Sequence, residues 1–181
     1  MQDLEKFRVP NGFRGKNPLT VQVWWFVQAS LFGLSPRFLY GWRRFLLRLF
    51  GAQIGKKVLI RPTARITYPW KVKIGDFSWI GDDVCIYSLG EIEIGSNTVV
   101  SQKSYLCAGS HEYNKNDFPI FSDAIKIGDG CWLATDVFVG PGITIGDQAV
   151  VGARSSVFKN LEGKKIYRGT PAKFIKDRSI D

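Results

Sequence analysis

The sequence predicts an all-β protein folded as a left-handed parallel β-helix, and three observations support this prediction. An isoleucine, leucine or valine recurs every six residues between Ile54 and Leu161. The count slips by about two residues after every third six-residue step, first after Val72 and again after Ile92. A glycine follows the first aliphatic residue of each group of three, at Gly55, Gly75, Gly95, Gly128 and Gly146. Short repeats of this kind are typical of solenoids, in which a repeat buries its apolar face only when its neighbours stack on it.

Each coil of the predicted β-helix holds three six-residue segments, so one coil takes about eighteen residues and has three sides. Because the slips all follow the third segment, we expect the insertions to leave from one corner. The recurring glycine predicts a corner whose backbone a Cβ would strain. A helical fold is excluded here, because glycine and β-branched residues dominate and no 3.6-residue period is present. Small or β-branched side chains stand four residues after the aliphatic positions, and we expect them in the narrow interior: Val58, Ala64, Ser78, Val84, Thr98, Ser104, Val137, Ala149 and Ser155.

Residues 1–53 differ from the repeat and predict helices. Residues 1–20 are polar and carry no signal-peptide pattern. Val21 to Leu34 is strongly apolar but shorter than the about twenty residues that a membrane-spanning helix needs. A second helix is expected from Arg37 to Phe50, where arginines alternate with apolar residues, and Gly51 would end it. These helices could cap the open end of the β-helix. They could also lie on a membrane surface as basic amphipathic segments, and the two roles are compatible.

Charge and cysteine content narrow the function classes. The 181 residues suffice for one domain with a sizeable core, the β-helix of residues 54–162, and the formal net charge is +9. The excess of lysine and arginine continues in a basic tail at residues 163–181, which we expect to leave the repeat. A net positive charge is expected of a solvated basic face, an anionic ligand site or a surface that binds membrane. Nucleic-acid binding is not favoured, because no nucleic-acid-binding motif accompanies the charge. Cys85, Cys107 and Cys131 are an odd number within the repeat and predict a reduced, cytoplasmic protein.

His111 is the only histidine in the chain and stands at the start of the only long insertion, the expected loop of residues 111–126. A lone histidine is usually a surface or packing residue. However, a loop that leaves a rigid scaffold is also the usual place for a functional side chain, and an imidazole can act as a general base near neutral pH. One histidine per chain argues against a zinc site built from a histidine cluster, so no metal is expected.

Several stretches resemble a known family. They are the isoleucine-glycine repeat, the Ser110-His111 loop, the runs of residues 127–134 and 139–146, and the tail at residues 167–173. In these stretches the chain is similar to the hexapeptide-repeat O-acetyltransferases. With its aromatic N-terminal segment it most resembles the bacterial exopolysaccharide acetyltransferases of the colanic acid type, the WcaF group. The resemblance implies a homotrimer with a site in each cleft between neighbouring prisms, acetyl-CoA along the groove, and His111 as the base in direct transfer to a sugar hydroxyl.

The resemblance also implies binding residues, position by position. The family's acetyl-CoA positions match Trp132, Ala134, Thr135, Gly152, Ala153, Lys159, Thr170, Pro171, Lys173 and Lys176. Of these, the lysines match positions near the nucleotide phosphates. A backbone N–H around Ala134 and Thr135 is the expected oxyanion donor, and the family more often has Gly-Ser there. Trp132 is equally well explained as an outward coil residue packed on a neighbour.

The family's acceptor residues match this chain less well than its acetyl-CoA residues do. Sugar acetyltransferases of the galactoside and maltose type have an asparagine where this chain has Gly81. Asp82, Asp83 and Tyr87 are the candidate sugar contacts, although carboxylates in turns are usually solvated. Two other functions stay open: an acetyltransferase for an amino acid, antibiotic or amino sugar, and a non-catalytic β-helix scaffold. A scaffold needs neither His111 nor the basic tail. The aromatic, basic N-terminus suits an acceptor at the inner membrane surface.

Overall fold

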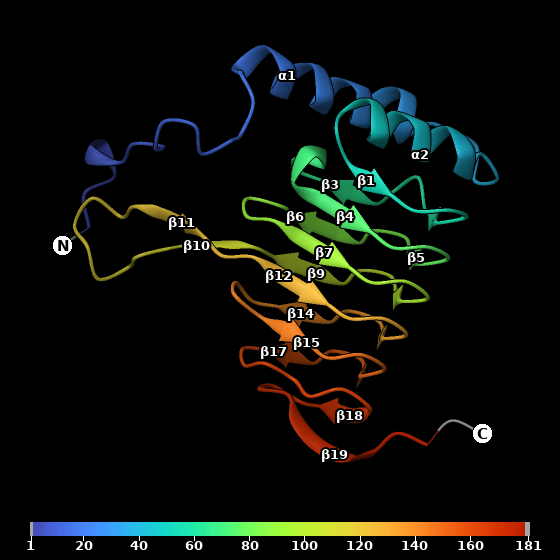
Figure 1. The fold of residues 1–181 in the computed structure, drawn as a ribbon. Helices are drawn as coiled ribbons and strands as arrows, with labels where there is room; N and C mark the ends of the chain where they lie inside the picture. The colour runs from blue at the N-terminus through green and yellow to red at the C-terminus, as the bar shows by residue number, and fades with distance from the viewer. Residues whose placement is uncertain (1, 180–181) are drawn as a thin grey trace.

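The structure is a computed structural model that describes residues 2–179. Its body is a left-handed parallel β-helix of about six coils, with two helices across one end and a projecting hairpin (Figure 1). The first side of the prism comprises β1 (Gln53–Ile54), β4 (Val72–Ile74), β7 (Ile92–Ile94), β12 (Ile125–Ile127) and β15 (Thr144–Ile145). The second comprises β2 (Leu59–Ile60), β5 (Trp79–Ile80), β8 (Val99–Val100), β13 (Trp132–Leu133), β16 (Val150–Val151), β18 (Lys165–Arg168) and β19 (Lys173–Asp177). The third comprises β3 (Arg65–Ile66), β6 (Cys85–Tyr87), β9 (Tyr105–Cys107), β14 (Phe138–Val139) and β17 (Ser156–Val157).

The predicted six-residue register is confirmed on all three sides. On the first side Ile54 pairs with Ile74, which pairs with Ile94, and the column continues through Ile127 to Ile145. The nine small or β-branched residues expected in the interior are all buried, at most 1% exposed. The stacked aliphatic columns therefore form one continuous core along the prism axis.

The cause predicted for the corner glycines is wrong. The left-handed backbone falls two residues later, as at Lys57 with φ +52° and Phe77 with φ +61°. A Cβ added to Gly75 would instead lie 2.5 Å from the backbone nitrogen of Ser96 in the next coil. The same contact at Gly55, with the nitrogen of Asp76, would be 2.7 Å. Glycine is needed because adjacent coils approach too closely for a side chain, not because its own φ is unusual.

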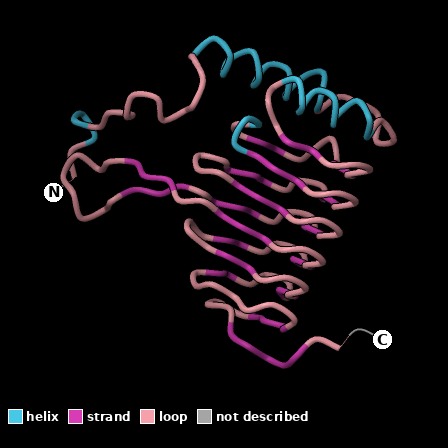
Figure 2. The backbone as a smooth tube through the Cα atoms, viewed as in Figure 1, coloured by secondary structure: helices cyan, strands magenta, loops and turns pink. Residues whose placement is uncertain are grey.

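The insertions leave from one corner, as predicted, where the third side turns into the first. We call this the 3–1 corner, and the corner between the second and third sides the 2–3 corner. The largest insertion at the 3–1 corner is an antiparallel hairpin of β10 (Gly109–His111) and β11 (Ile120–Ser122), which projects from the prism (Figures 1 and 2). The short helix η3 (Pro69–Lys71) occupies the same corner two coils nearer the N-terminal end.

Two N-terminal helices lie across the first coil (Figure 1). Helix α1 (Pro18–Val27) begins after Asn17, whose side chain accepts a hydrogen bond from Thr20 N at 2.8 Å, and continues as a wider turn, η2 (Gln28–Phe32). Helix α2 (Tyr40–Leu49) starts three residues later than expected, because residues 36–39 form a turn closed from Leu39 N to Pro36 O. A short turn, η1 (Leu4–Lys6), precedes them.

The helices cap the open edge of the β-helix on all three sides, through side chains that donate to backbone carbonyls of the first coil. Arg48 Nε donates to Ile54 O at 3.0 Å, Arg43 Nε to Ile60 O at 2.6 Å, and Trp24 Nε1 to Ile66 O at 2.8 Å. These three carbonyls belong to the aliphatic columns of the first, second and third sides. The cap therefore satisfies the strand edge that would otherwise be unpaired.

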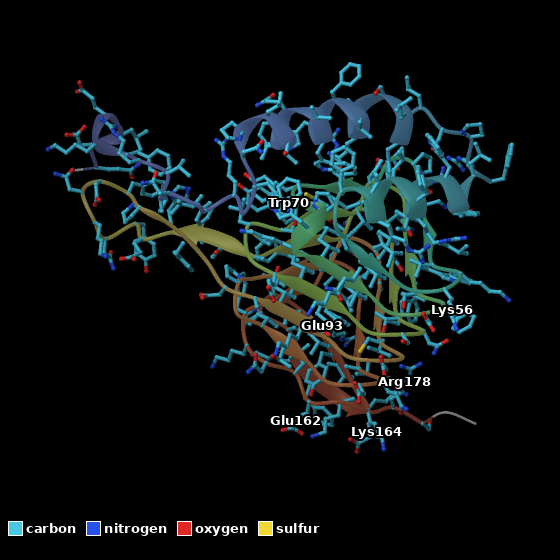
Figure 3. The ribbon with its side chains drawn as sticks, turned by 45° about the horizontal axis from the view of Figure 1, so that its top comes forward. Lys56, Trp70, Glu93, Glu162, Lys164 and Arg178 are labelled. Atoms are coloured by element: carbon cyan, nitrogen blue, oxygen red, sulfur yellow. The ribbon has the colours of Figure 1, made fainter. Side chains whose placement is uncertain are left out.

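The C-terminal tail corrects another expectation, since its first part remains in the repeat. β18 pairs in parallel with β16, which places Tyr167 opposite Val151. Tyr167 is 6% exposed and occupies the aliphatic position of the second side. Because Tyr167 is aromatic, a count of aliphatic residues missed β18, the sixth strand of the second side. β19 then folds back on β18 and leads to Arg178 (labelled in Figure 3). Arg178 Nη1 donates to Gly130 O at 2.8 Å and to Gln148 O at 3.0 Å.

Candidate active site

His111 is the last residue of β10 and pairs with Ile120 across the hairpin. Its Nδ1 lies 2.9 Å from the backbone oxygen of Phe118. Since a carbonyl oxygen can only accept, Nδ1 carries the proton in the neutral ring, and Nε2 keeps its lone pair. The hairpin thus fixes the tautomer and leaves the outer nitrogen of a half-buried imidazole free to accept a proton.

The N-terminal segment supports this hairpin from outside. Asp3 N donates to Asn116 O at 2.8 Å at the hairpin tip. The ring of Phe7 lies 5.7 Å from that of His111, between centroids and at a tilt of 52°. The imidazole therefore packs on the rings of both Phe7 and Phe118, which restricts its rotation.

Seven of the ten residues that the family resemblance assigns to acetyl-CoA lie at the 2–3 corner or directly beside it. Thr135 and Ala153 stand in the turns of successive coils, and Arg154 N donates to Thr135 O at 2.9 Å between them. Trp132 lies on the second side beside this corner, 48% exposed, with its Nε1 3.1 Å from Ser101 Oγ. The tail returns to the same place, since Thr170 Oγ1 lies 3.4 Å from Arg154 O. The members of this set are Trp132, Ala134, Thr135, Gly152, Ala153, Thr170 and Pro171.

The backbone at this corner distinguishes between the two candidate oxyanion donors. Ala134 N donates to Val151 O at 2.9 Å, so this N–H is already used by the second sheet. Thr135 N has no protein acceptor among the described residues. Thr135 is half-buried and stands just past the end of the strand. Its N–H is therefore the one that a bound molecule could use.

The three predicted lysines are separated. Lys173 and Lys176 lie exposed on β19, at the end of the second side. Lys159 follows β17 and is therefore at the 3–1 corner, one full side away from Thr135. Within one chain these three cations do not form a single anion site.

The candidate acceptor residues are also divided between the corners. Asp82 and Asp83 stand at the 2–3 corner, where Lys103 N donates to Asp82 O at 2.9 Å. Asp82 already pairs with Arg61, at 3.4 Å, and Asp83 has a left-handed backbone with φ +58°. Tyr87 ends β6 at the 3–1 corner, and burial raises the pKa of its hydroxyl. The two carboxylates and the tyrosine therefore do not converge in one chain.

Sequence reasoning missed a cavity of about 510 Å³ on the second side. Its walls include Trp79, Arg61 and Gln102, which the sequence analysis did not single out as site residues. Asp82 and the neighbouring Gly81, both named there in connection with the acceptor, also line it. Arg61 Nη1 donates to Tyr40 OH at 3.1 Å, which brings helix α2 into the wall. Trp79 occupies the same coil position as Trp132, two coils earlier, and this repetition could have indicated it.

One chain does not assemble the complete candidate site. His111 leaves the prism at the 3–1 corner, whereas Thr135 and Ala153 lie at the 2–3 corner, and the third side separates the two corners. Within residues 2–179, no group of three or more histidine, cysteine, aspartate or glutamate side chains is placed to hold a metal ion.

Comparison with known proteins agrees with this fold. No family model matches the chain. The chain is 61% identical over 178 residues to a protein of Escherichia coli K12 named as the colanic acid biosynthesis acetyltransferase WcaF, covering 98% of both chains. It is 27% identical over 139 residues to the galactoside O-acetyltransferase of the same organism, covering 75% of this chain and 68% of that one.

A solved structure gives the same result for the fold. A hexapeptide-repeat acetyltransferase of Vibrio cholerae, crystallised with acetyl-CoA, superimposes with a TM-score of 0.84 at 22% identity, covering 99% of this chain and 100% of that one. The repeat and the similarity over the whole length agree. The chain belongs to the hexapeptide-repeat acetyltransferases, in the group of the colanic acid acetyltransferase WcaF.

Proposed function

We propose that the protein transfers the acetyl group of acetyl-CoA to a sugar hydroxyl of a surface polysaccharide or its precursor, with His111 as general base. The observation that carries the proposal is the hydrogen bond from His111 Nδ1 to Phe118 O, which leaves Nε2 as the acceptor. The similarity to the colanic acid acetyltransferase supports the polysaccharide acceptor, and the Vibrio cholerae complex supports acetyl-CoA as the donor.

The reaction needs no acyl-enzyme. Nε2 of His111 takes the proton of the sugar hydroxyl as its oxygen attacks the thioester carbonyl. The oxyanion that forms accepts a hydrogen bond from Thr135 N–H. When the tetrahedral intermediate collapses, the C–S bond breaks and the imidazolium returns its proton to the CoA sulfur. Holding both substrates side by side supplies much of the rate.

The residues of the 2–3 corner suit an extended thioester substrate. Gly152 and Ala153 are small and follow directly from β16, so the pantetheine arm can approach the backbone there. Lys173 and Lys176 lie exposed on β19 at the end of the same side, where they would meet the anionic phosphates. Thr170 and Pro171 lie at the adenine end, and Trp132 flanks the groove.

We also propose that the active unit is a homotrimer. In one chain the base and the acetyl-CoA corner lie at opposite ends of the third side, so a neighbouring copy must supply one of them. The same packing would bring Lys159 towards the acetyl-CoA corner of the neighbour. The reaction would take place in the cytoplasm, where acetyl-CoA is made.

The test is release of free thiol from acetyl-CoA by the full chain, with and without a panel of free, nucleotide-linked and lipid-linked sugars. Transfer to a glycan with ester formation supports the proposal. Transfer only to amino acids, antibiotics or amino groups would assign the enzyme to another acceptor class. Absence of any acceptor-dependent thiol release would leave only a binding or scaffolding role.

A further inference from the structure

The outer face of the N-terminal cap is apolar over its whole length. Of the 21 exposed large hydrophobic residues in the described chain, 11 lie between Leu19 and Leu49. On α1 and η2 they recur as Leu19, Val23 and Phe26 and continue to Leu31 and Leu34. In the turn and on α2 they recur as Phe38, Leu39, Trp42, Phe45 and Leu49. We call this surface, together with Trp25, the cap face.

The spacing shows that the cap face is separate from the core. Phe38, Trp42, Phe45 and Leu49 follow the i, i+4, i+7 and i+11 spacing of one helical stripe. The opposite stripe of α2, with Leu46 and Leu47, is buried against the first coil. Helix α1 has the same double character, because Val21, Trp24 and Val27 are buried beneath it. A helix that is apolar on both sides is normally covered on both sides.

The two helices present this surface together. Trp42 Nε1 of α2 donates to Leu31 O of η2 at 2.9 Å, and the rings of Trp42 and Phe45 stack with centroids 5.7 Å apart. Both helices lie across the end of the prism, with side chains projecting away from it (Figures 1 and 3). The cap face is therefore broad and fixed in position before anything binds.

The charge around the cap face indicates what covers it. Residues 6–75 contain 14 lysines and arginines and no aspartate or glutamate. Exposed members include Lys16 before α1, Arg37 between the helices, and Lys56 at the edge of the first coil (Figure 3). A second copy placed on this face would bring two like-charged ends together, which costs energy. An apolar surface with a positively charged rim is instead complementary to an anionic lipid surface.

We propose that the cap face is a membrane-docking surface, which inserts its aromatic side chains at the headgroup boundary of a bilayer rich in anionic phospholipid. Among the described residues no helix has the length and apolar character needed to cross a bilayer. Docking lays the two helices on the membrane surface and sets the prism axis along the membrane normal, with the cap nearest the lipid. This inference is independent of the acetyl transfer proposed above.

The first test measures co-flotation of the full chain with vesicles, at low salt. The probes are vesicles of phosphatidylcholine alone and of phosphatidylcholine with an equal part of phosphatidylglycerol. We expect binding to the anionic vesicles at least tenfold tighter than to the neutral ones, lowered by added salt. No binding to either vesicle, or equal binding to both at every salt concentration, would overturn the proposal.

The second test compares matched variants on the anionic vesicles. Phe26→Gln with Phe38→Gln removes rings that are 71% and 76% exposed, and should weaken binding about tenfold for each side chain. Phe158→Gln with Phe174→Gln, 58% and 52% exposed and distant from the cap, should leave binding unchanged. Equal effects of the two pairs would contradict the assignment.

The third test removes positive charge beside the cap face. Lys16→Gln with Arg37→Gln should weaken vesicle binding about fivefold for each cation, whereas Lys126→Gln with Lys164→Gln should not.

Light scattering without vesicles tests whether the cap face instead binds a second copy of the chain. If the phenylalanine pair lowers the oligomer mass, the face is an interface between chains and the membrane proposal is wrong. Thiol release with a water-soluble acceptor reports catalysis separately, so loss of docking and loss of transfer are distinguishable.

Discussion

The imidazole of His111 lies nearly parallel to the ring of Phe118, with centroids 4.2 Å apart and an interplanar angle of 8°. The same residue supplies the carbonyl that orients Nδ1. Phe118 has φ +47°, so the hairpin turns sharply there and brings both its ring and its backbone to the histidine. One residue thus fixes both the plane of the base and its tautomer.

His111→Asn should lower kcat about a hundred- to ten-thousand-fold, because an amide cannot accept the proton of the acceptor hydroxyl. Acetyl-CoA affinity and the thermal melt should stay unchanged, since the hairpin lies outside the coil core. Steady-state transfer and a melting curve measure the two effects. Glu112→Gln, next along the hairpin and exposed, is the matched control. Near-normal turnover in the His111 variant would show that another group is the base.

Thr135→Pro should lower kcat about a hundred- to a thousandfold by removing a single N–H. The fold should tolerate proline, because Pro62 occupies the same corner position three coils earlier. Thr135→Ala keeps the N–H and should retain most activity. Gln102→Pro, in the preceding coil at the same position, controls for the backbone change. If the proline variant is folded and fully active, the oxyanion donor lies elsewhere.

Changing Lys159 and Lys173 together to alanine should raise the KM for acetyl-CoA about tenfold while kcat changes little. Both side chains are exposed and should act on the CoA phosphates rather than on the reacting carbonyl. Initial rates over a range of acetyl-CoA concentrations at moderate salt separate the two constants. Lys126→Ala with Lys164→Ala removes equal charge elsewhere. An unchanged KM would refute the placement of the phosphates.

Mixed oligomers should reveal a site shared between chains. The His111→Asn and Thr135→Pro proteins, each inactive alone, are unfolded, mixed in equal amounts and refolded. If the base and the oxyanion donor come from neighbouring copies, random trimers should recover about a quarter of the wild-type activity. The separately refolded proteins, mixed afterwards, serve as the control. No recovery from folded mixed oligomers would mean that one chain holds the whole site.

Arg43→Met should lower the free energy of unfolding by about 2–4 kcal/mol. The guanidinium of Arg43 is fully buried and donates to Ile60 O, Ser35 Oγ, Pro36 O and Arg37 O. Methionine keeps much of the volume but removes all four hydrogen bonds, and Ile60 O and Arg37 O then lose their donor. Urea unfolding followed by tryptophan fluorescence measures the loss, with Arg65→Met at an exposed strand position as the control. A loss no larger than in the control would show that the cap does not depend on this side chain.

The amino-acid sequence by itself determined the β-helix, its register and the corner from which the insertions leave. Ile54, Ile74 and Ile94 stack because a six-residue period has few other ways to bury every aliphatic side chain. The same count located His111 on the one long insertion. It did not reveal Tyr167 as a coil residue. Tyrosine is not aliphatic, so the count passed over it, although its backbone occupies the same position of the coil.

Only the tertiary structure decided how those elements are used. The glycines proved necessary through contacts between coils, as at Gly75 and Ser96, and such contacts cannot be read from a single repeat. The hydrogen bond from His111 to Phe118 depends on the path of the hairpin. The partition of His111 and Thr135 between two corners depends on where each coil turns. The sequence names the groups that can react, but the distances between them are set by packing, which joins residues far apart in the chain.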